Sequence, residues 1–163
     1  MSTPPPRLLT VCLGNICRSP TAEAALREAA QQAGLDVEVR SAGTGSWHVG
    51  ASPDPRMRAA AADDGLHLSG TAEQVTAAMI AESDVVFAMD RSNLADLHRM
   101  AQQDGVTTPI HLFREFDPDL TGHGSTADVP DPYYGGPDGF AEVVRMCRRT
   151  ARAVIDRLDE LLA

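Results

Sequence analysis

Residues 8–20, LLTVCLGNICRSP, join three patterns in one short stretch: an apolar run, a polar loop and the beginning of a helical pattern. The apolar run 8–12 contains no strand-breaking residue and predicts a buried parallel strand. Gly14 and Asn15 then interrupt it, and both residue types tolerate a positive φ, so the backbone can curl there. Pro20 suits the first turn of a helix, and helical spacing follows it. The stretch therefore predicts a strand–loop–helix unit.

The rest of the chain repeats this alternation of strand and helix. Further strands are expected at residues 37–41, 84–90 and 110–113, and helices at 20–33, 54–64, 72–81, 92–103 and 140–162. Strands that alternate with helices form a parallel sheet that is covered on both faces. Four strands in 163 residues predict a single α/β domain with a flavodoxin-like, doubly wound four-stranded parallel sheet in the order 2-1-3-4. Residues 1–6 are expected to form a disordered tail.

In such a fold, ligands bind beyond the carboxyl ends of the strands, near the switch point of the strand order. The loops expected at that edge are residues 12–19, 42–53, 91–92 and 114–137. The residues with the most distinctive chemistry fall in these loops, including the only tryptophan, Trp47. The functional site is therefore expected at this edge of the sheet.

The composition excludes several classes of function. The chain has 14 basic residues, all of them arginine, against 23 acidic residues, and the resulting formal charge of -9 argues against nucleic-acid binding. Three cysteines are too few for a disulfide scaffold. The start of the chain has no apolar segment typical of a signal peptide, and no apolar run approaches the ~20 residues of a membrane span. We expect a cytoplasmic protein without membrane contact, monomeric or weakly dimeric.

The loop of residues 12–19 has the composition of an anion site. A curled loop points several N–H groups inward, and the following helix adds its free N–H groups and the positive end of its dipole. Arg18 adds a planar fork that matches two phosphate oxygens. Cys12 lies at the mouth of this positive field, which favours a thiolate, and a thiolate beside a bound phosphate is a nucleophile directed at phosphorus. The alternative is a core cysteine beside a surface arginine. An ATP-binding loop is excluded, because its Gly-Lys-Ser/Thr is missing.

Two motifs resemble the signatures of one known family. Residues 12–20, CLGNICRSP, are similar to the signature loop of the low-molecular-weight protein tyrosine phosphatases, and Asp131-Pro-Tyr-Tyr134 is similar to the second signature of that family. The order and spacing agree over residues 7–162. The resemblance implies hydrolysis of phosphotyrosine in proteins, and of small aryl phosphates, through a phosphocysteine intermediate. Inorganic phosphate is the implied product, phosphotyrosine-containing proteins are the implied partners, and no cofactor is required.

The resemblance also implies roles for individual residues. Cys12 attacks phosphorus, while Arg18 and the loop amides bind the phosphate oxygens as charge develops. The phosphate-binding loop comprises Leu13, Gly14, Asn15, Ile16, Cys17 and Arg18. Asp131 protonates the leaving phenolate oxygen and then activates the water that releases phosphate. Residue chemistry alone does not separate Asp131 from three other aspartates of the same long loop: Asp117, Asp119 and Asp128.

Residues around the loop are expected to support it and to shape the cleft. In the family, Ser19 hydrogen-bonds the thiolate, and Asn15 and Ser41 hold the backbone conformation of the loop; capping or turn chemistry would account for the same residue types. The substrate cleft is expected to be lined by Ile16, Trp47, His48, Tyr133 and Tyr134. The alternative for Trp47 is partial burial beneath its own loop. A deep aromatic cleft favours phosphotyrosine, because only this longer side chain brings its phosphate to the nucleophile.

The other two cysteines and two further aspartates are expected to have supporting roles outside the reaction itself. The resemblance implies that Cys17 forms a reversible disulfide with Cys12 and protects it from overoxidation, the alternative being a simple packed thiol. Cys147 lies on the apolar stripe of the last predicted helix and is expected in the core. Asp54 and Asp90 stand at a helix start and a strand end, where capping or loop support is expected, the alternative being a catalytic role.

No metal is expected, because the five histidines show no spacing typical of a metal site. The chain also departs from the family in one place. Family members often carry a histidine followed by a basic residue just before the third helix, whereas here that place reads Leu68-Ser-Gly-Thr-Ala72 and His67 falls a few residues early. This departure concerns the tuning of the nucleophile rather than the reaction.

Three other activities compete with the phosphotyrosine hypothesis. Protein arginine phosphatases resemble the chain but typically carry threonine at the position of Ile16, so the branched apolar side chain favours a tyrosine phosphatase. Arsenate reductases of this fold need two further cysteines close together, and only Cys147 is left over. A phosphocysteine carrier domain of the sugar phosphotransferase type would need neither Arg18 nor Asp131 and would retain its phosphate.

Overall fold

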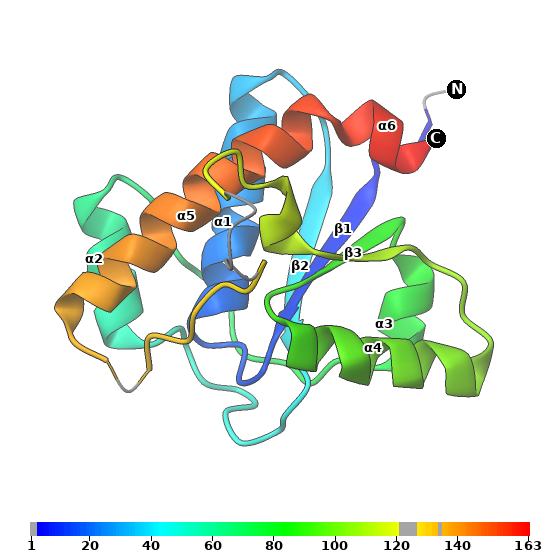
Figure 1. Cartoon of the computed structure of the whole chain (residues 1–163), viewed down its shortest axis with the longest axis horizontal. Coiled ribbons are helices and arrows are strands. Elements are labelled where there is room, and N and C mark those ends of the chain that lie inside the picture. Colours follow the sequence, from blue (N-terminus) through cyan, green and yellow to red (C-terminus); the bar gives the residue numbers. More distant parts are fainter. Residues whose placement is uncertain (1–2, 121–126, 134) are drawn as a thin grey trace.

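The computed structural model describes residues 3–120, 127–133 and 135–163 and is built around a four-stranded sheet (Figure 1). The strands are β1 (Arg7–Cys12), β2 (Glu38–Gly43), β3 (Val85–Ala88) and β4 (Ile110–Leu112). All of them pair in parallel, in the order β2-β1-β3-β4. The predicted fold class and strand order are confirmed.

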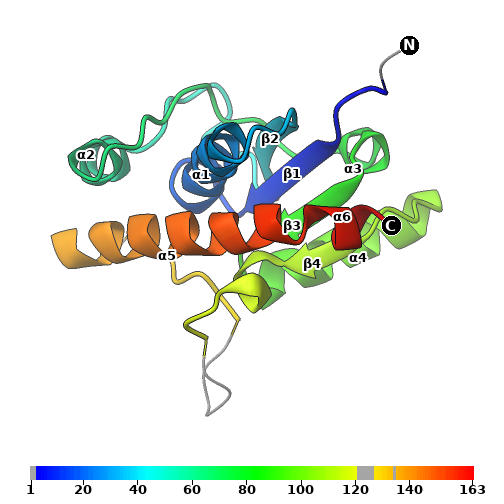
Figure 2. The same cartoon turned by 90° about the horizontal axis from the view of Figure 1, so that it is seen from above.

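Helices cover both faces of this sheet. They are α1 (Arg18–Gln32), α2 (Pro55–Asp63), α3 (Ala77–Glu82), α4 (Arg91–Asp104), the 3-10 helix η1 (Phe113–Phe116), α5 (Pro137–Asp156) and α6 (Leu158–Leu162). Figure 2 shows α3 and α4 on the opposite side of the sheet from α1 and α5. Among the described residues, no helix is both long enough and apolar enough to cross a membrane.

The two cores follow from the alternation of side chains along β1. Leu8 points into a cluster with Leu26 of α1 and Val144 of α5, whereas Leu9 points into a second cluster with Leu97 of α4. Successive strand residues face opposite sides of a sheet, so an unbroken apolar run is needed where both sides are covered. This double burial explains why residues 8–12 are apolar except for Thr10, whose buried hydroxyl donates to the Ser19 carbonyl at 2.9 Å.

The helix predicted over 72–81 is wrong in its first half. Thr76 caps α3 by accepting the N–H of Met79 at 3.1 Å, so the helix begins only at Ala77. Before this cap the chain lies beside β2, where Gly43 and Gln74 form a parallel bridge. Backbone pairing with β2 therefore replaces the helical bonds that the composition favoured.

The helix predicted over 140–162 differs as well. It begins earlier, at Pro137, and is interrupted at Arg157, which separates α5 from α6. Leu158 is buried beyond the interruption, so the apolar spacing continues across the break and conceals it in the sequence. The long loop predicted over 114–137 also contains most of η1.

Candidate active site

The loop after β1 closes around the sulfur of Cys12. The Cys12 Sγ lies 3.0 Å from the Ser19 Oγ and accepts the backbone N–H of Asn15 at 3.2 Å. Helix α1 starts at Arg18, so the positive end of its dipole lies beside the same loop. The structure thus brings Cys12 and Ser19 together as the sequence predicted.

Asn15 is the residue that holds the loop in its curled shape. Its φ is 57°, in the left-handed region. Its Nδ2 donates to the Ser19 Oγ at 2.8 Å and to the Ser41 Oγ at 3.0 Å, while its Oδ1 accepts the N–H of Glu73 at 2.9 Å. Ser41 in turn donates to the Glu23 carboxylate at 2.5 Å. The predicted supporting residues therefore form one network, and it extends to Glu23, which sequence reasoning missed.

Arg18 is buried beneath the mouth of the loop. Its Nη1 donates to the Asp90 carboxylate at 2.6 Å and to the backbone carbonyl of Val129 at 3.2 Å. Burial lowers the pKa of Arg18, but the nearby Cys12 and Asp90 groups outweigh this effect and raise the pKa above its ordinary value. The Arg18 guanidinium therefore stays positively charged, and its two hydrogen bonds fix its orientation.

Of the four aspartates that the sequence left open, Asp131 is the one that lines the pocket. Its carboxylate lies 3.7 Å from the Arg18 Nη2 and accepts the N–H of Tyr133 at 3.1 Å. Asp117 is fully buried against Arg149 and Arg114, Asp119 pairs with Arg149, and Asp128 pairs with Arg91. Asp131 is therefore the one of these four whose carboxylate lies beside both the pocket and Arg18.

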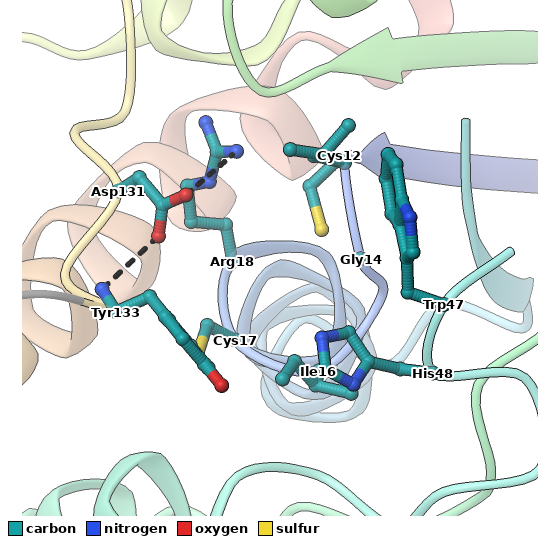
Figure 3. A pocket seen from close by; sticks show the side chains of 10 residues that line it. Cys12, Gly14, Ile16, Cys17, Arg18, Trp47, His48, Asp131 and Tyr133 are labelled. Atoms are coloured by element: carbon teal, nitrogen blue, oxygen red, sulfur yellow. Dashed lines mark hydrogen bonds and ion pairs between the residues drawn. The ribbon is translucent and has the colours of Figure 1, made fainter. Parts of the chain in front are cut away.

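A pocket of about 470 Å³ opens above Cys12 (Figure 3). Its wall contains Trp47, His48, Asp131 and Tyr133 in addition to residues of the loop, Leu13 and Ile16 among them. Trp47 is 73% exposed, so the alternative of burial beneath its loop is wrong. The rings of His48 and Tyr133 lie 6.1 Å apart. Tyr134, predicted for the same cleft, lies outside the described residues.

Two glycines let the aromatic side chains of the 42–53 loop lie close to the backbone. A Cβ at Gly45 would come within 2.0 Å of the Trp47 ring. A Cβ at Gly14 would come within 3.0 Å of the His48 ring. The positions of Trp47 and His48 at the rim therefore depend on the absence of a side chain at both glycines.

Burial raises the pKa of the other two thiols, Cys17 and Cys147. Burial raises the pKa of Cys17 to about 12, with further contributions from Asp54, Cys12 and Asp131. Burial likewise raises the pKa of Cys147 to about 12, and this side chain packs in the core as predicted. Both groups are therefore neutral thiols near pH 7.

The two capping aspartates behave as predicted, and one of them does more. Asp54 accepts the N–H groups of Arg56 and Met57 at the start of α2, and hydrogen bonds from Arg56 lower its pKa. Asp90 caps α4 and is also the ion-pair partner of Arg18. No residue pattern indicated this second role, because it depends on how β3 is placed beside β1.

Among the described residues, no group of three or more His, Cys, Asp or Glu side chains could hold a metal ion.

The region where the family histidine is absent borders a second cavity of about 260 Å³. Its lining includes Glu23, Ser41, Ser69 and Gly70. Glu23 forms the outer end of the Asn15 network: its carboxylate accepts from the Ser41 hydroxyl and also pairs with Arg27.

The fold and the site together define a class of doubly wound α/β proteins with a cysteine-centred anion loop. The family model described as "Low molecular weight phosphotyrosine protein phosphatase" matches residues 7–162, and the chain belongs to this family.

Relatives and solved structures agree with this assignment. The chain is 42% identical over 156 residues to a low molecular weight protein-tyrosine-phosphatase of Streptomyces coelicolor, with 94% of both chains covered. A protein tyrosine phosphatase structure from Entamoeba histolytica has a TM-score of 0.85 at 34% identity, with 95% of this chain and 97% of that chain covered. A Drosophila arginine phosphatase structure also has a TM-score of 0.85, at 31% identity, with 93% and 96% covered.

Proposed function

We propose that the chain hydrolyses phosphotyrosine in proteins, and small aryl phosphates, through a phosphocysteine intermediate on Cys12. One observation carries the proposal: Cys12, Arg18 and Asp131 line the same pocket, although their positions span most of the chain. The family match and the names of the relatives support the same class of reaction. The proposed partners are phosphotyrosine-containing proteins of the cytoplasm, where the three free cysteines would stay reduced.

In the first step, the Cys12 thiolate attacks phosphorus while the bond from phosphorus to the phenolic oxygen breaks. Arg18 and the loop amides receive the charge that develops on the phosphate oxygens, and such preorganised electrostatic stabilisation usually accelerates a reaction more than any other single effect. Asp131, in its protonated form, gives its proton to the leaving oxygen. The products of this step are the phenol and phosphocysteine.

In the second step, water attacks phosphorus while the sulfur–phosphorus bond breaks. Asp131, now a carboxylate, takes the proton of this water, which restores its starting state. Inorganic phosphate leaves and the Cys12 thiolate is regenerated. Ser19 at 3.0 Å from the sulfur and the N–H of Asn15 stabilise the thiolate as leaving group.

The shape of the pocket supports an aromatic phosphate ester. Tyr133 and Trp47 form walls on which a phenyl ring can pack, and Ile16 contributes an apolar side chain from the loop itself. Phosphoarginine is the second candidate, because a Drosophila arginine phosphatase has the same fold over 93% of this chain. Ile16→Thr is expected to raise activity toward phosphoarginine relative to phosphotyrosine, whereas an unchanged ratio would remove Ile16 as a specificity determinant.

Hydrolysis assays on three proteins test the proposed function. Wild-type protein is expected to turn over p-nitrophenyl phosphate and a phosphotyrosine peptide, Cys12→Ser to lose activity, and Asp131→Asn to lose about a hundredfold or more. A Cys12→Ser protein with full turnover would refute the proposal. Stoichiometric labelling of the protein without turnover would indicate a phosphate carrier instead.

A further inference from the structure

The loop that carries Asp131 is anchored near both of its ends by one arginine. Arg114, in η1, donates its Nε to the Asp117 carboxylate at 3.2 Å and its Nη1 to the backbone carbonyl of Asp128 at 3.1 Å. Asp117 stands at the start of the loop, and Asp128 stands three residues before Asp131. A single side chain therefore connects the beginning of the loop to the segment that carries the proposed acid.

Asp117 makes this anchor rigid. Its side chain is fully buried and also accepts two hydrogen bonds from Arg149 of α5, at 2.7 and 3.0 Å. Burial raises the pKa of Asp117, but hydrogen bonds from Arg149 and Arg114 more than compensate, so its pKa is lowered. Freeing either partner of a buried ion pair leaves an uncompensated charge, which is strongly unfavourable. Arg114 is thereby tied to a core helix.

The backbone just before Asp131 has little remaining freedom. The N–H of Val129 donates to the carbonyl of Met89 at 2.7 Å, and the Val129 carbonyl accepts from Arg18 at 3.2 Å. Only Pro130 separates Val129 from Asp131, and proline fixes its own φ. The position of the Asp131 carboxyl therefore depends on where the preceding backbone is held.

We propose that Arg114, held by Asp117, is a positioning residue for Asp131 and acts through the carbonyl of Asp128. The inference rests on the proposed function, because it requires Asp131 to be the general acid. Phosphate binding at Arg18 depends chiefly on Asp90, which lies outside this loop and accepts from Arg18 at 2.6 Å. The contacts of Arg18 with the loop itself are longer, at 3.2 Å to the Val129 carbonyl and 3.7 Å to the Asp131 carboxylate. A loss of the anchor should therefore slow proton transfer and leave phosphate binding almost unchanged.

Proton donation matters most when the leaving phenol is a weak acid and least when it is a strong one. Arg114→Ala is expected to slow phosphocysteine formation from phosphotyrosine about tenfold, a part of the roughly 10²–10⁴-fold that a general acid contributes. With 2,4-dinitrophenyl phosphate, whose phenol leaves without help, the rate should stay close to that of the wild type. The signature is a steeper dependence of rate on the acidity of the phenol.

The experiment measures single-turnover rates for a series of aryl phosphates with graded phenols. It uses wild type, Arg114→Ala, Asp131→Asn, the double variant and a matched control, Arg99→Ala. Arg99 pairs only with Asp96 on the exposed surface of α4 among the ion pairs of the described residues. We expect Arg99→Ala to match the wild type. In the Asp131→Asn background, Arg114→Ala should cause no further loss, because the group it positions is already disabled.

An equal loss with every phenol, or an additive loss in the Asp131→Asn background, would overturn the proposal in favour of a general structural effect. Arg114→Lys keeps a charge beside Asp117 but lacks the two-pronged fork, and it serves if the alanine variant does not fold. The same steepening is expected of it. If Asp131→Asn itself shows no steepening, the assignment of the acid fails and the role of Arg114 fails with it. If Asp131→Asn steepens the dependence of rate on phenol acidity but Arg114→Ala does not, Asp131 remains the proposed acid and only the positioning role of Arg114 is wrong.

Discussion

Arg18 and Asp90 form an ion pair behind the anion loop, with the guanidinium nitrogen and the carboxylate oxygen 2.6 Å apart. The Arg18 side chain is only 4% exposed. The same aspartate accepts the N–H of Asn93 at 2.7 Å and thereby caps α4. One carboxylate therefore orients the proposed phosphate-binding arginine and also begins a helix.

Asp90→Asn separates these two contributions. Asparagine caps a helix about as well as aspartate, but it removes the charge that holds Arg18. A hydrogen bond to a charged group contributes about 1.5–3 kcal/mol, so we expect kcat/KM for p-nitrophenyl phosphate to fall about tenfold or more. Asp90→Ala should be about 1 kcal/mol less stable to urea than Asp90→Asn, because it also loses the cap. A folded Asp90→Asn with unchanged kcat/KM would contradict this role.

Asn15 should contribute to stability through both its backbone and its side chain. At a φ of 57°, alanine is strained by about 1–2 kcal/mol relative to glycine. Both Asn15→Gly and Asn15→Ala lose the hydrogen bonds to Ser19, Ser41 and Glu73, each contributing about 1 kcal/mol. Urea unfolding should therefore rank wild type above Asn15→Gly and Asn15→Gly above Asn15→Ala. An alanine variant as stable as the glycine variant would show that the backbone strain is absent.

The fold and the strand–loop–helix unit around Cys12 could be predicted from the sequence because their signals are local. Residues 8–20 contain the strand, the loop and the helix start in one continuous stretch, and this stretch sets the backbone positions of Cys12 and Arg18. The signal that ends α4 is equally local: the C-cap residue is Gly105, and glycine readily adopts the φ of 67° found there.

The partners from distant segments could not be predicted in this way. Asp90 meets Arg18 because β3 pairs with β1, and the residue patterns around either position do not show this. Residue chemistry alone does not show which of the four aspartates of this loop lines the pocket, because burial and the arginine that each one meets are set by the tertiary structure. The helix predicted over 72–81 was wrong because a tertiary bridge to Gly43 outweighed local propensity.

Gly45→Ala tests whether Trp47 helps to bind substrate. The new Cβ would lie 2.0 Å from the Trp47 ring, so the ring must move. Trp47 is the only tryptophan, and its fluorescence emission should shift. We expect KM for a phosphotyrosine peptide to rise a few-fold with kcat nearly unchanged, because a wall of the pocket binds substrate and transition state alike.

Gly136→Ala is the matched control for this variant, because a Cβ there meets no atom of the described residues within 4 Å. It should keep both the wild-type emission and the wild-type KM. A Gly45→Ala protein that also kept both would show that the ring does not contribute to binding.

The proposed redox role of Cys17 has a defined pH dependence. Hydrogen peroxide transfers one oxygen to the Cys12 thiolate, which gives a sulfenic acid and hydroxide, and the Cys17 thiolate then attacks that sulfur and displaces a second hydroxide. Because the pKa of Cys17 is raised to about 12, closure of the disulfide should accelerate about tenfold per pH unit over the neutral range.

Mass spectrometry after mild peroxide should show a Cys12–Cys17 disulfide, and dithiothreitol should restore activity. The Cys17→Ser variant should lose this recovery. Sulfonic acid at Cys12 as the sole product in the wild type would count against Cys17 as a protecting thiol.

The most direct test of the proposed chemistry is to trap the intermediate during turnover. The Cys17→Ser variant leaves Cys12 as the sole thiol of the loop; it is mixed with excess p-nitrophenyl phosphate, quenched with acid within milliseconds and analysed by mass spectrometry. We predict one phosphoryl group on Cys12 that disappears once the substrate is exhausted. Phenol release without any phosphoryl group on Cys12, or with that group on Ser19, would contradict the proposed mechanism.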